Sequence, residues 1–215
     1  DVSPCKGKNR FEIFSPFSRP CLNPLVFKVF RPFSPTIEKT ASFYAPYIAS
    51  SSDGLIKFVN TYRSLTHVSA PVKKPFFVRE LIDKVEHLTR ESVHQAGAVF
   101  LYEEKSDDIL LYADENQLSQ VFVNLVKNAL QAGATKIKIT AEIDFAETIK
   151  IAVSNNGRPI SAESQEEIFV PFYTTKQEGT GIGLSLSRQI MRLHNGTLTL
   201  ARSDQRMTTF LLHFK

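Results

Sequence analysis

The sequence predicts an α/β fold of two layers, a mixed sheet with helices packed on one of its faces. Two observations carry this prediction. Helical and strand patterns alternate along the chain after residue 70. The strand patterns at 135–143 and 148–157, and again those at 197–203 and 207–214, follow one another across short turns. Such short connections exclude an all-parallel sheet, and a single layer of helices can then cover the sheet.

The first 70 residues do not follow this pattern. Residues 1–50 contain seven of the eleven prolines together with seven phenylalanines. Proline at that density excludes a long helix and disfavours central strands, so we assign no fold to this segment. Residues 51–70 begin with a helical pattern and end in a linker; the apolar positions of the pattern are Leu55, Ile56, Val59, Tyr62 and Leu65. We therefore expect three parts, at 1–50, 51–70 and 71–215.

Three helical patterns follow in the expected domain, the second of them after a short strand at 108–114. The first spans 78–92, and the residues expected on its apolar face are Leu81, Ile82, Val85 and Leu88. The second and strongest spans 115–133, and its apolar stripe is Leu118, Val121, Phe122, Leu125 and Ala129. Gly133 is typical of the residue that ends a helix. The third helix spans 183–196.

Composition and charge narrow the classes of function. Residues 1–50 hold seven Lys and Arg against three Asp and Glu, which accounts for the whole net charge of +4. The remainder is balanced and has no electrostatic signature for nucleic acid. No apolar run is long enough to cross a bilayer, and the start lacks the apolar run of a signal peptide. Cys5 and Cys21 fit neither a disulfide framework nor a metal site, which favours a reducing cytosolic setting.

The first candidate motif lies on the 115–133 helix. Asn124, Asn128 and Gln131 are spaced by four and three residues and therefore share one face. Amide oxygens suit a Mg²⁺ that also keeps water and phosphate ligands. The same spacing also fits an exposed polar face.

The second motif is VSNNGRPI at 153–160. Asn155 stands at the end of a strand, where a polar side chain can meet the amino edge of adenine. Gly157 would let the backbone approach the ring. An ordinary Asn-Gly turn explains the same residues equally well.

The third motif is IFVPFYTTK at 168–176. We expect Phe169 and Phe172 to anchor a loop. The hydroxyl and lysine side chains at its tip would then face phosphate; they are Thr174, Thr175 and Lys176.

The fourth motif is KQEGTGIGLSLSRQI at 176–190, in which three glycines alternate before a helix. A Rossmann loop would need its third glycine at Leu184, and a P-loop would need Gly-Lys before Ser or Thr, so neither fits. Backbone N–H groups at the helix start can still face phosphates. The residues concerned are Thr180, Gly181, Ile182 and Gly183.

In this order and spacing, the four motifs resemble the ATP-binding domain of sensor histidine kinases, within the gyrase, Hsp90, histidine kinase and MutL superfamily. QVFVNLVKNALQA resembles the N box, VSNNGRPI the first glycine box, IFVPFYTTK the F box and GTGIGLSLSRQIMRLHNG the second glycine box. The resemblance covers residues 71–215 and implies a Bergerat-type ATP-binding fold. The helix within 51–70 is similar to the second helix of the family's dimerisation hairpin.

The resemblance implies that Mg-ATP binds here and that its γ-phosphate passes to a histidine and then to a response regulator. Asn128 and Asn124 would hold Mg²⁺, and these two residues with Lys176 would be catalytic. The residues implied to bind the nucleotide are Asn128, Gln131, Asn155, Gly157, Ile160, Thr174, Thr175, Lys176, Thr180, Gly181, Ile182, Gly183 and Leu184. Lys176 and the 179–183 loop would form a mobile lid. The resemblance further implies a homodimer through the hairpin, as the cytoplasmic portion of an inner-membrane receptor whose spans lie outside this chain.

The sequence also departs from the family. Asn155 replaces the usual aspartate, Gln131 replaces a basic phosphate contact, and Pro159 replaces a glycine. Arg206 and Met207 stand in place of a final glycine turn.

Two alternatives remain open. One is an ATPase, but hydrolysing members of the superfamily place a glutamate base where Asn124 stands, and an amide cannot take a proton from water at neutral pH. The other is a nucleotide-binding module without catalysis. None of the histidines is followed by an acidic residue as the family's acceptor is, so we expect no self-phosphorylation at the usual residue; they are His67, His87, His94, His194 and His213.

Overall fold

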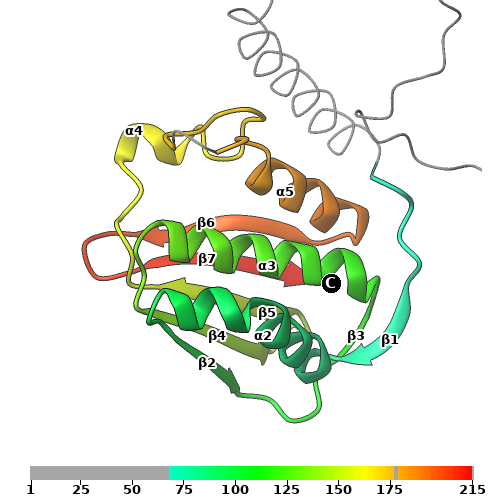
Figure 1. Cartoon of the computed structure of the whole chain (residues 1–215). Coiled ribbons are helices and arrows are strands. Elements are labelled where there is room, and N and C mark those ends of the chain that lie inside the picture. The colour runs from blue at the N-terminus through cyan, green and yellow to red at the C-terminus, as the bar shows by residue number, and fades with distance from the viewer. Residues whose placement is uncertain (1–67, 177–178, 215) are drawn as a thin grey trace, which may run out of the picture. The chain divides into compact units, whose positions relative to one another are not determined.

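The computed structural model describes residues 68–176 and 179–214, and these form two layers (Figure 1). The strands of the main sheet are β2 Val99–Glu104, β4 Lys136–Ile143, β5 Ile149–Asn155, β6 Thr197–Ser203 and β7 Thr208–Phe214. Their order across the sheet is β2-β4-β5-β7-β6. The pair β2 and β4 is parallel, and every later pair is antiparallel. The predicted mixed sheet is therefore confirmed.

Helices α2 (Val78–Gln95), α3 (Glu115–Gln131) and α5 (Gly183–Leu193) cover one face of this sheet (Figure 1). Helix α3 contacts both α2 and α5, so it is the central helix of the layer. A short helix, α4, spans Ala162–Gln165, and strands β1 (Lys74–Phe77) and β3 (Leu110–Ala113) pair antiparallel in a separate small sheet. The predicted two-layer arrangement, with helices on one face, is confirmed.

Both ends of α3 are fixed by local hydrogen bonds. At its start, the Asp114 side chain accepts from the backbone N–H groups of Asn116 and Gln117. At its end, Gly133 has a φ of +78°, and the two hydrogen bonds of a Schellman motif close the last turn. The Gly133 N–H donates to Leu130 O, and the Ala134 N–H donates to Ala129 O. The glycine predicted to end the helix does so.

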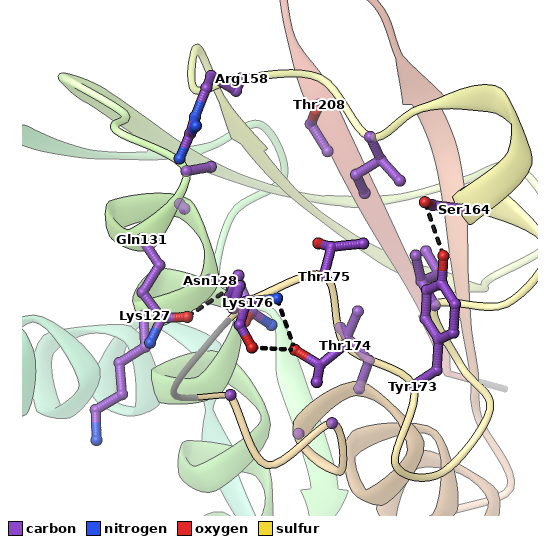
Figure 2. A pocket seen from close by; sticks show the side chains of 18 of the residues that line it. Lys127, Asn128, Gln131, Arg158, Ser164, Tyr173, Thr174, Thr175, Lys176 and Thr208 are labelled. Carbon is purple, nitrogen blue, oxygen red and sulfur yellow. Dashed lines mark hydrogen bonds between the residues drawn. The ribbon is translucent and has the colours of Figure 1, made fainter.

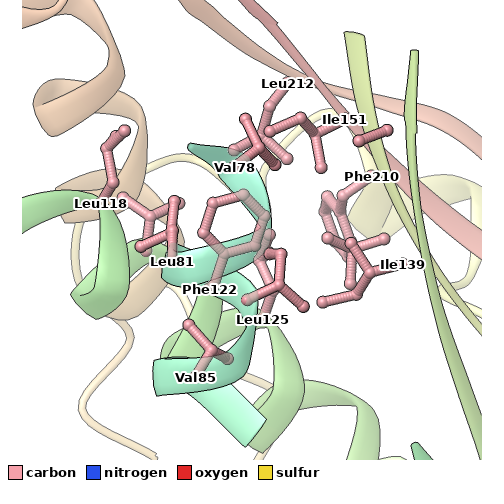
Figure 3. Packing of buried hydrophobic residues seen from close by; sticks show 14 of the residues in the cluster. Val78, Leu81, Val85, Leu118, Phe122, Leu125, Ile139, Ile151, Phe210 and Leu212 are labelled. Atoms are coloured by element: carbon pink, nitrogen blue, oxygen red, sulfur yellow. The ribbon is translucent and has the colours of Figure 1, made fainter. Parts of the chain in front are cut away.

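The core lies between the helices and the sheet (Figure 3). The predicted stripe of α3 is buried throughout; its members are Leu118, Val121, Phe122, Leu125 and Ala129. Opposite it stand alternating residues of the central strands, among them Ile139, Ile151, Phe210 and Leu212. The strand period of two and the helix period of 3.6 therefore supply the two faces that meet.

Some local predictions are wrong. Leu88 was expected on the apolar face of its helix, but it is 57% exposed. The buried stripe of α2 continues through Thr89 and Val93 instead. Three elements were not predicted, namely strands β1 and β2 and helix α4. Strand β1 and helix α4 have four residues each, which is too short to show an apolar period. No residue of β2 is fully buried, so this strand has no strongly apolar face.

The predictions for residues 1–50, and for the helix expected within 51–70, lie outside the described residues. Within the described part of the chain, no helix is both long and apolar enough to cross a membrane.

Candidate functional site

A cavity of about 760 Å³ lies between α3, the end of β5 and the described residues between Arg158 and Leu184 (Figure 2). All but two of the predicted site residues line it. Those that do are Asn124, Asn128, Gln131, Asn155, Ile160, Thr174, Thr175, Lys176, Thr180, Gly181, Gly183 and Leu184. The structure thus brings residues from all four sequence motifs, which lie between 124 and 184, around one space.

Gly157 and Ile182 are the predicted residues that do not line the cavity. Gly157 packs against the end of α3, where an added Cβ would lie 2.9 Å from Ala132 Cβ. Ile182 is 9% exposed at the start of α5, and its carbonyl accepts from the Leu186 N–H. Both residues shape the backbone around the cavity.

One wall of the cavity, here called the helix wall, is the polar edge of α3 formed by Asn124, Asn128 and Gln131. Asn124 Nδ2 donates to Ser187 Oγ at 3.0 Å and so ties α3 to α5. Its other end lies against Gly183, since a Cβ added at that glycine would collide with Asn124 Oδ1. Glycine at 183 therefore allows the start of α5 to approach the helix wall.

Lys176 bonds to the other two amides of the helix wall (Figure 2). Its Nζ donates to Asn128 Oδ1 at 3.2 Å and to Gln131 Oε1 at 2.6 Å. Burial and the nearby charge of Arg158 lower the pKa of Lys176. Both amides thus turn an oxygen toward a cation inside the cavity.

The opposite wall, here called the loop wall, consists of the described residues from 168 to 176 and from 179 to 182. Phe169 packs edge-on against Phe210, with ring centroids 6.4 Å apart, and Arg188 lies 4.6 Å above the Phe169 ring. Phe169 therefore anchors the wall, as predicted. The side chain of Phe172, in contrast, is 39% exposed, so it does not belong to the buried core.

The backbone of Phe172 also holds the loop wall together. Its N–H donates to Gly181 O at 2.9 Å. Gly181 has a φ of +67°, and a Cβ there would collide with the Phe172 backbone. The two segments of the loop wall therefore meet backbone to backbone at a position that requires glycine.

The far end of the cavity combines an apolar slot with a polar residue. Ile160, Leu184 and Phe210 contribute apolar surface. Asn155 is 7% exposed, and its Oδ1 accepts from the Gly157 N–H at 3.0 Å. Thr208, opposite Asn155 on β7, is also buried and shares a hydrogen bond of 2.9 Å with Ser203 Oγ. This end suits a flat apolar ring with a polar edge.

The charge of the lining is one-sided. Lys127, Arg158 and Lys176 are cationic, and none of the described lining residues is Asp or Glu. Sequence reasoning missed Arg158 as a lining residue, although it directly follows the Asn-Gly turn. It also missed Tyr173, whose Oη donates to Ser164 Oγ of α4 at 2.8 Å. Such a lining favours an anionic ligand.

The residues present fit a magnesium ion that is shared with a phosphate. Asn128 Oδ1 already faces a cationic group, and amide oxygens are hard ligands. Among the described residues, no group of three or more His, Cys, Asp or Glu could hold a metal without help. An ion here would therefore keep water and take its anionic ligands from whatever phosphate compound shares the cavity.

Comparison with known proteins places this cavity in a family. Residues 113–215 match the family model "Histidine kinase-, DNA gyrase B-, and HSP90-like ATPase". The sensor histidine kinase ZraS of Escherichia coli (strain K12) is 39% identical over 104 residues, or 47% of this chain. The catalytic domain of histidine kinase ThkA is 36% identical with a TM-score of 0.60, and the match covers 66% of this chain and 94% of that domain. The chain belongs to the histidine kinase family.

A second structure of ThkA also matches this chain. A structure of ThkA in complex with the response regulator protein TrrA is 28% identical with a TM-score of 0.63, covering 88% of this chain and 54% of that one. The chain spans only 22% of the length of ZraS. Most of the length of ZraS therefore lies outside the part that this chain matches.

Proposed function

We propose that this histidine kinase domain binds Mg-ATP in the cavity and transfers its γ-phosphoryl group to a histidine, which passes it to an aspartate of a response regulator. One observation carries the proposal. The amides of the helix wall, Lys176 and the glycine-rich loop converge on a single cavity whose described lining contains cations and no carboxylate. Such a site neutralises a triphosphate from several directions.

The side chains would divide the work along the nucleotide. The apolar slot and Asn155 would hold the base, and Lys176, Thr174 and Thr175 would contact the phosphates. Asn128, with Asn124 beside it, would hold the metal, which supplies positive charge between the β- and γ-phosphates when bound. In the transfer, a P–N bond to a neutral imidazole forms as the bond from the γ-phosphorus to the bridging oxygen breaks, and ADP leaves.

Transfer to histidine is favoured over hydrolysis by the helix wall. Asn124 donates to Ser187 and cannot act as a base toward water. No described lining residue offers a carboxylate for that role either. A neutral imidazole needs no such base, because its ring nitrogen already carries a free lone pair.

The histidine that receives phosphate would come from a dimerisation hairpin. His194 is unsuited, because it is buried, its Nε2 accepts from the Asp114 N–H at 3.0 Å, and its Nδ1 bonds to Ile190 O at 2.8 Å. As the family resemblance of the sequence implies, the whole protein would form a homodimer through that hairpin and lie on the cytoplasmic side of a membrane receptor. The ThkA–TrrA complex supports a response regulator as the downstream partner.

Incubation with radiolabelled ATP and a separately purified, intact histidine kinase hairpin tests this function. Label on the hairpin, absent with Asn128→Ala, is the expected result. Nucleotide binding without label would favour the second candidate, a module whose loop wall reports occupancy to partners. Steady phosphate release that exceeds the rate of transfer would favour an ATPase.

A further inference from the structure

We propose that the cavity binds 6-oxopurine nucleotides, such as ITP and GTP, about as well as it binds ATP, because Asn155 presents a hydrogen-bond donor to the base. This inference rests on the proposed nucleotide-binding function and concerns the base end of the same cavity. The deciding feature is the orientation of one buried amide.

The orientation of Asn155 is fixed by its neighbour. Its Oδ1 accepts from the Gly157 N–H at 3.0 Å in a buried position. A reversed amide would set Nδ2 against that N–H, so two donors would meet and a buried N–H would lose its partner. Nδ2 therefore occupies the other end of the side chain. Among the described residues, none accepts a hydrogen bond from it, and Asn155 lines the cavity.

A donor at this place suits one class of purine better than the other. Adenine carries an amino group at position 6, which is itself a donor. Hypoxanthine and guanine carry a carbonyl oxygen there, which accepts. An aspartate at residue 155 could accept from Gly157 with one oxygen and from the adenine amino group with the second. Asn155 offers Nδ2 in place of that second oxygen, so the preference for adenine is removed.

The other groups at this end do not restore the preference. Ile160, Leu184 and Phe210 would contact the faces of the ring, which are similar in all purines. In the hydrogen bond between Thr208 and Ser203, at 2.9 Å, either hydroxyl can donate, so Thr208 can adapt to a donor or an acceptor. Asn155 is therefore the residue that sets the discrimination at position 6.

The inference is tested by measuring how strongly ATP and ITP each compete for binding to the full chain. ITP is the sharper probe, because it lacks the 2-amino group of guanine. A fluorescent ATP analogue is displaced by each nucleotide in the presence of Mg²⁺. For the wild type we expect the two dissociation constants to agree within about threefold, and for Asn155→Asp we expect ATP to be favoured by at least about tenfold.

Asn156→Asp is the matched control. It adds the same charge one residue later, but Asn156 is exposed and does not line the cavity. Its Oδ1 accepts from the N–H groups of Thr135 and Lys136, which a carboxylate can also do. The ratio of the two dissociation constants should stay at the wild-type value.

Each outcome separates this inference from the proposed function. A wild-type preference for ATP of more than about threefold overturns the inference and leaves the ATP site intact. Failure of both nucleotides to bind overturns the proposed function itself. Should Asn155→Asp not fold, judged by circular dichroism, the wild-type ratio still decides, and Asn155→Ala should weaken ITP relative to ATP because the donor is lost.

Discussion

The two walls of the cavity are held in place by different means. The helix wall belongs to α3, whose opposite side is buried in the core and whose ends are closed by Asp114 and Gly133. The loop wall depends on a few contacts, chiefly the ring contact of Phe169 with Phe210, the Phe172–Gly181 backbone hydrogen bond, the Tyr173–Ser164 hydroxyl pair and the hydrogen bonds of Lys176 to α3. Changes behind the helix wall should therefore affect folding, whereas changes in the loop wall should affect ligand binding alone.

The largest effect is expected from Phe122→Ala, which removes a ring buried completely behind the helix wall. The free energy of unfolding should fall by about 3–5 kcal/mol, because a cavity replaces the ring. Denaturant titration measures this. Thr175→Ala in the exposed part of the loop wall is the comparison, and it should leave the free energy of unfolding within about 0.5 kcal/mol of wild type. Equal losses would contradict the distinction between the walls.

Asn128→Ala should have the next largest effect, and on ligand affinity only. The Mg²⁺-dependent part of the affinity for an ATP analogue should fall by about 10- to 100-fold, because an amide ligand of the metal is lost. Calorimetry with and without Mg²⁺ measures that part directly. Asn128 is only half-buried, so the free energy of unfolding should barely change. An unchanged magnesium dependence would exclude Asn128 as the ligand.

Gly181→Ala should act on the loop wall alone. A Cβ there collides with the Phe172 backbone and forces the segment to move, so nucleotide affinity should fall by about tenfold. Gly97→Ala is the matched control, since Gly97 also has a positive φ, of +61°, but open space around it. The control should lose about 1–2 kcal/mol of unfolding free energy through backbone strain and keep its nucleotide affinity. The same affinity loss in both variants would contradict the role of the clash.

The smallest effect is expected at the β6–β7 turn, away from both walls. Asp204 accepts from the backbone N–H groups of Arg206 and Met207 and from the Arg202 side chain. These hydrogen bonds, that from Arg206 foremost, lower the pKa of Asp204 from 3.8 to about 2. Because the folded pKa is depressed, the stabilisation is present above pH 3.8 and is lost as the pH falls through about 2.

Asp204→Asn tests that turn. The variant should be slightly less stable than wild type near pH 6, and the difference should shrink toward zero as the pH approaches 2. Denaturant titrations at several pH values measure this difference. A gap that stays constant with pH would mean that the carboxylate charge does not hold the turn.

Much of the fold was predictable because its strongest patterns coincide with its most buried elements. Helix α3 was predicted with its buried stripe and its final glycine, and the pairs of antiparallel strands followed from alternation and short turns. Elements without an apolar period escaped prediction. Strand β2 pairs with β4 in parallel, a partner far along the chain, and none of its residues is fully buried.

The candidate site was predictable as a set of motifs but not as a geometry. The motifs named most of the residues that line the cavity, yet Arg158 and Tyr173 were missed, since each lies beside a motif and reaches the cavity only by the course of its loop. The aromatic pattern at 168–176 could not say that Phe169 packs edge-on against Phe210, or that the Phe172 N–H donates to Gly181 O.

By itself, the sequence determined the two-layer α/β fold and the four motifs, because hydrophobic period and residue spacing act locally along the chain. Only the tertiary structure decided what those groups face. Lys176 meets Asn128 and Gln131 across 45 residues or more of chain, and Gly157 fixes which end of the Asn155 amide is left for a ligand. Hydrogen-bond partners between distant segments depend on how the segments pack, which no local pattern encodes.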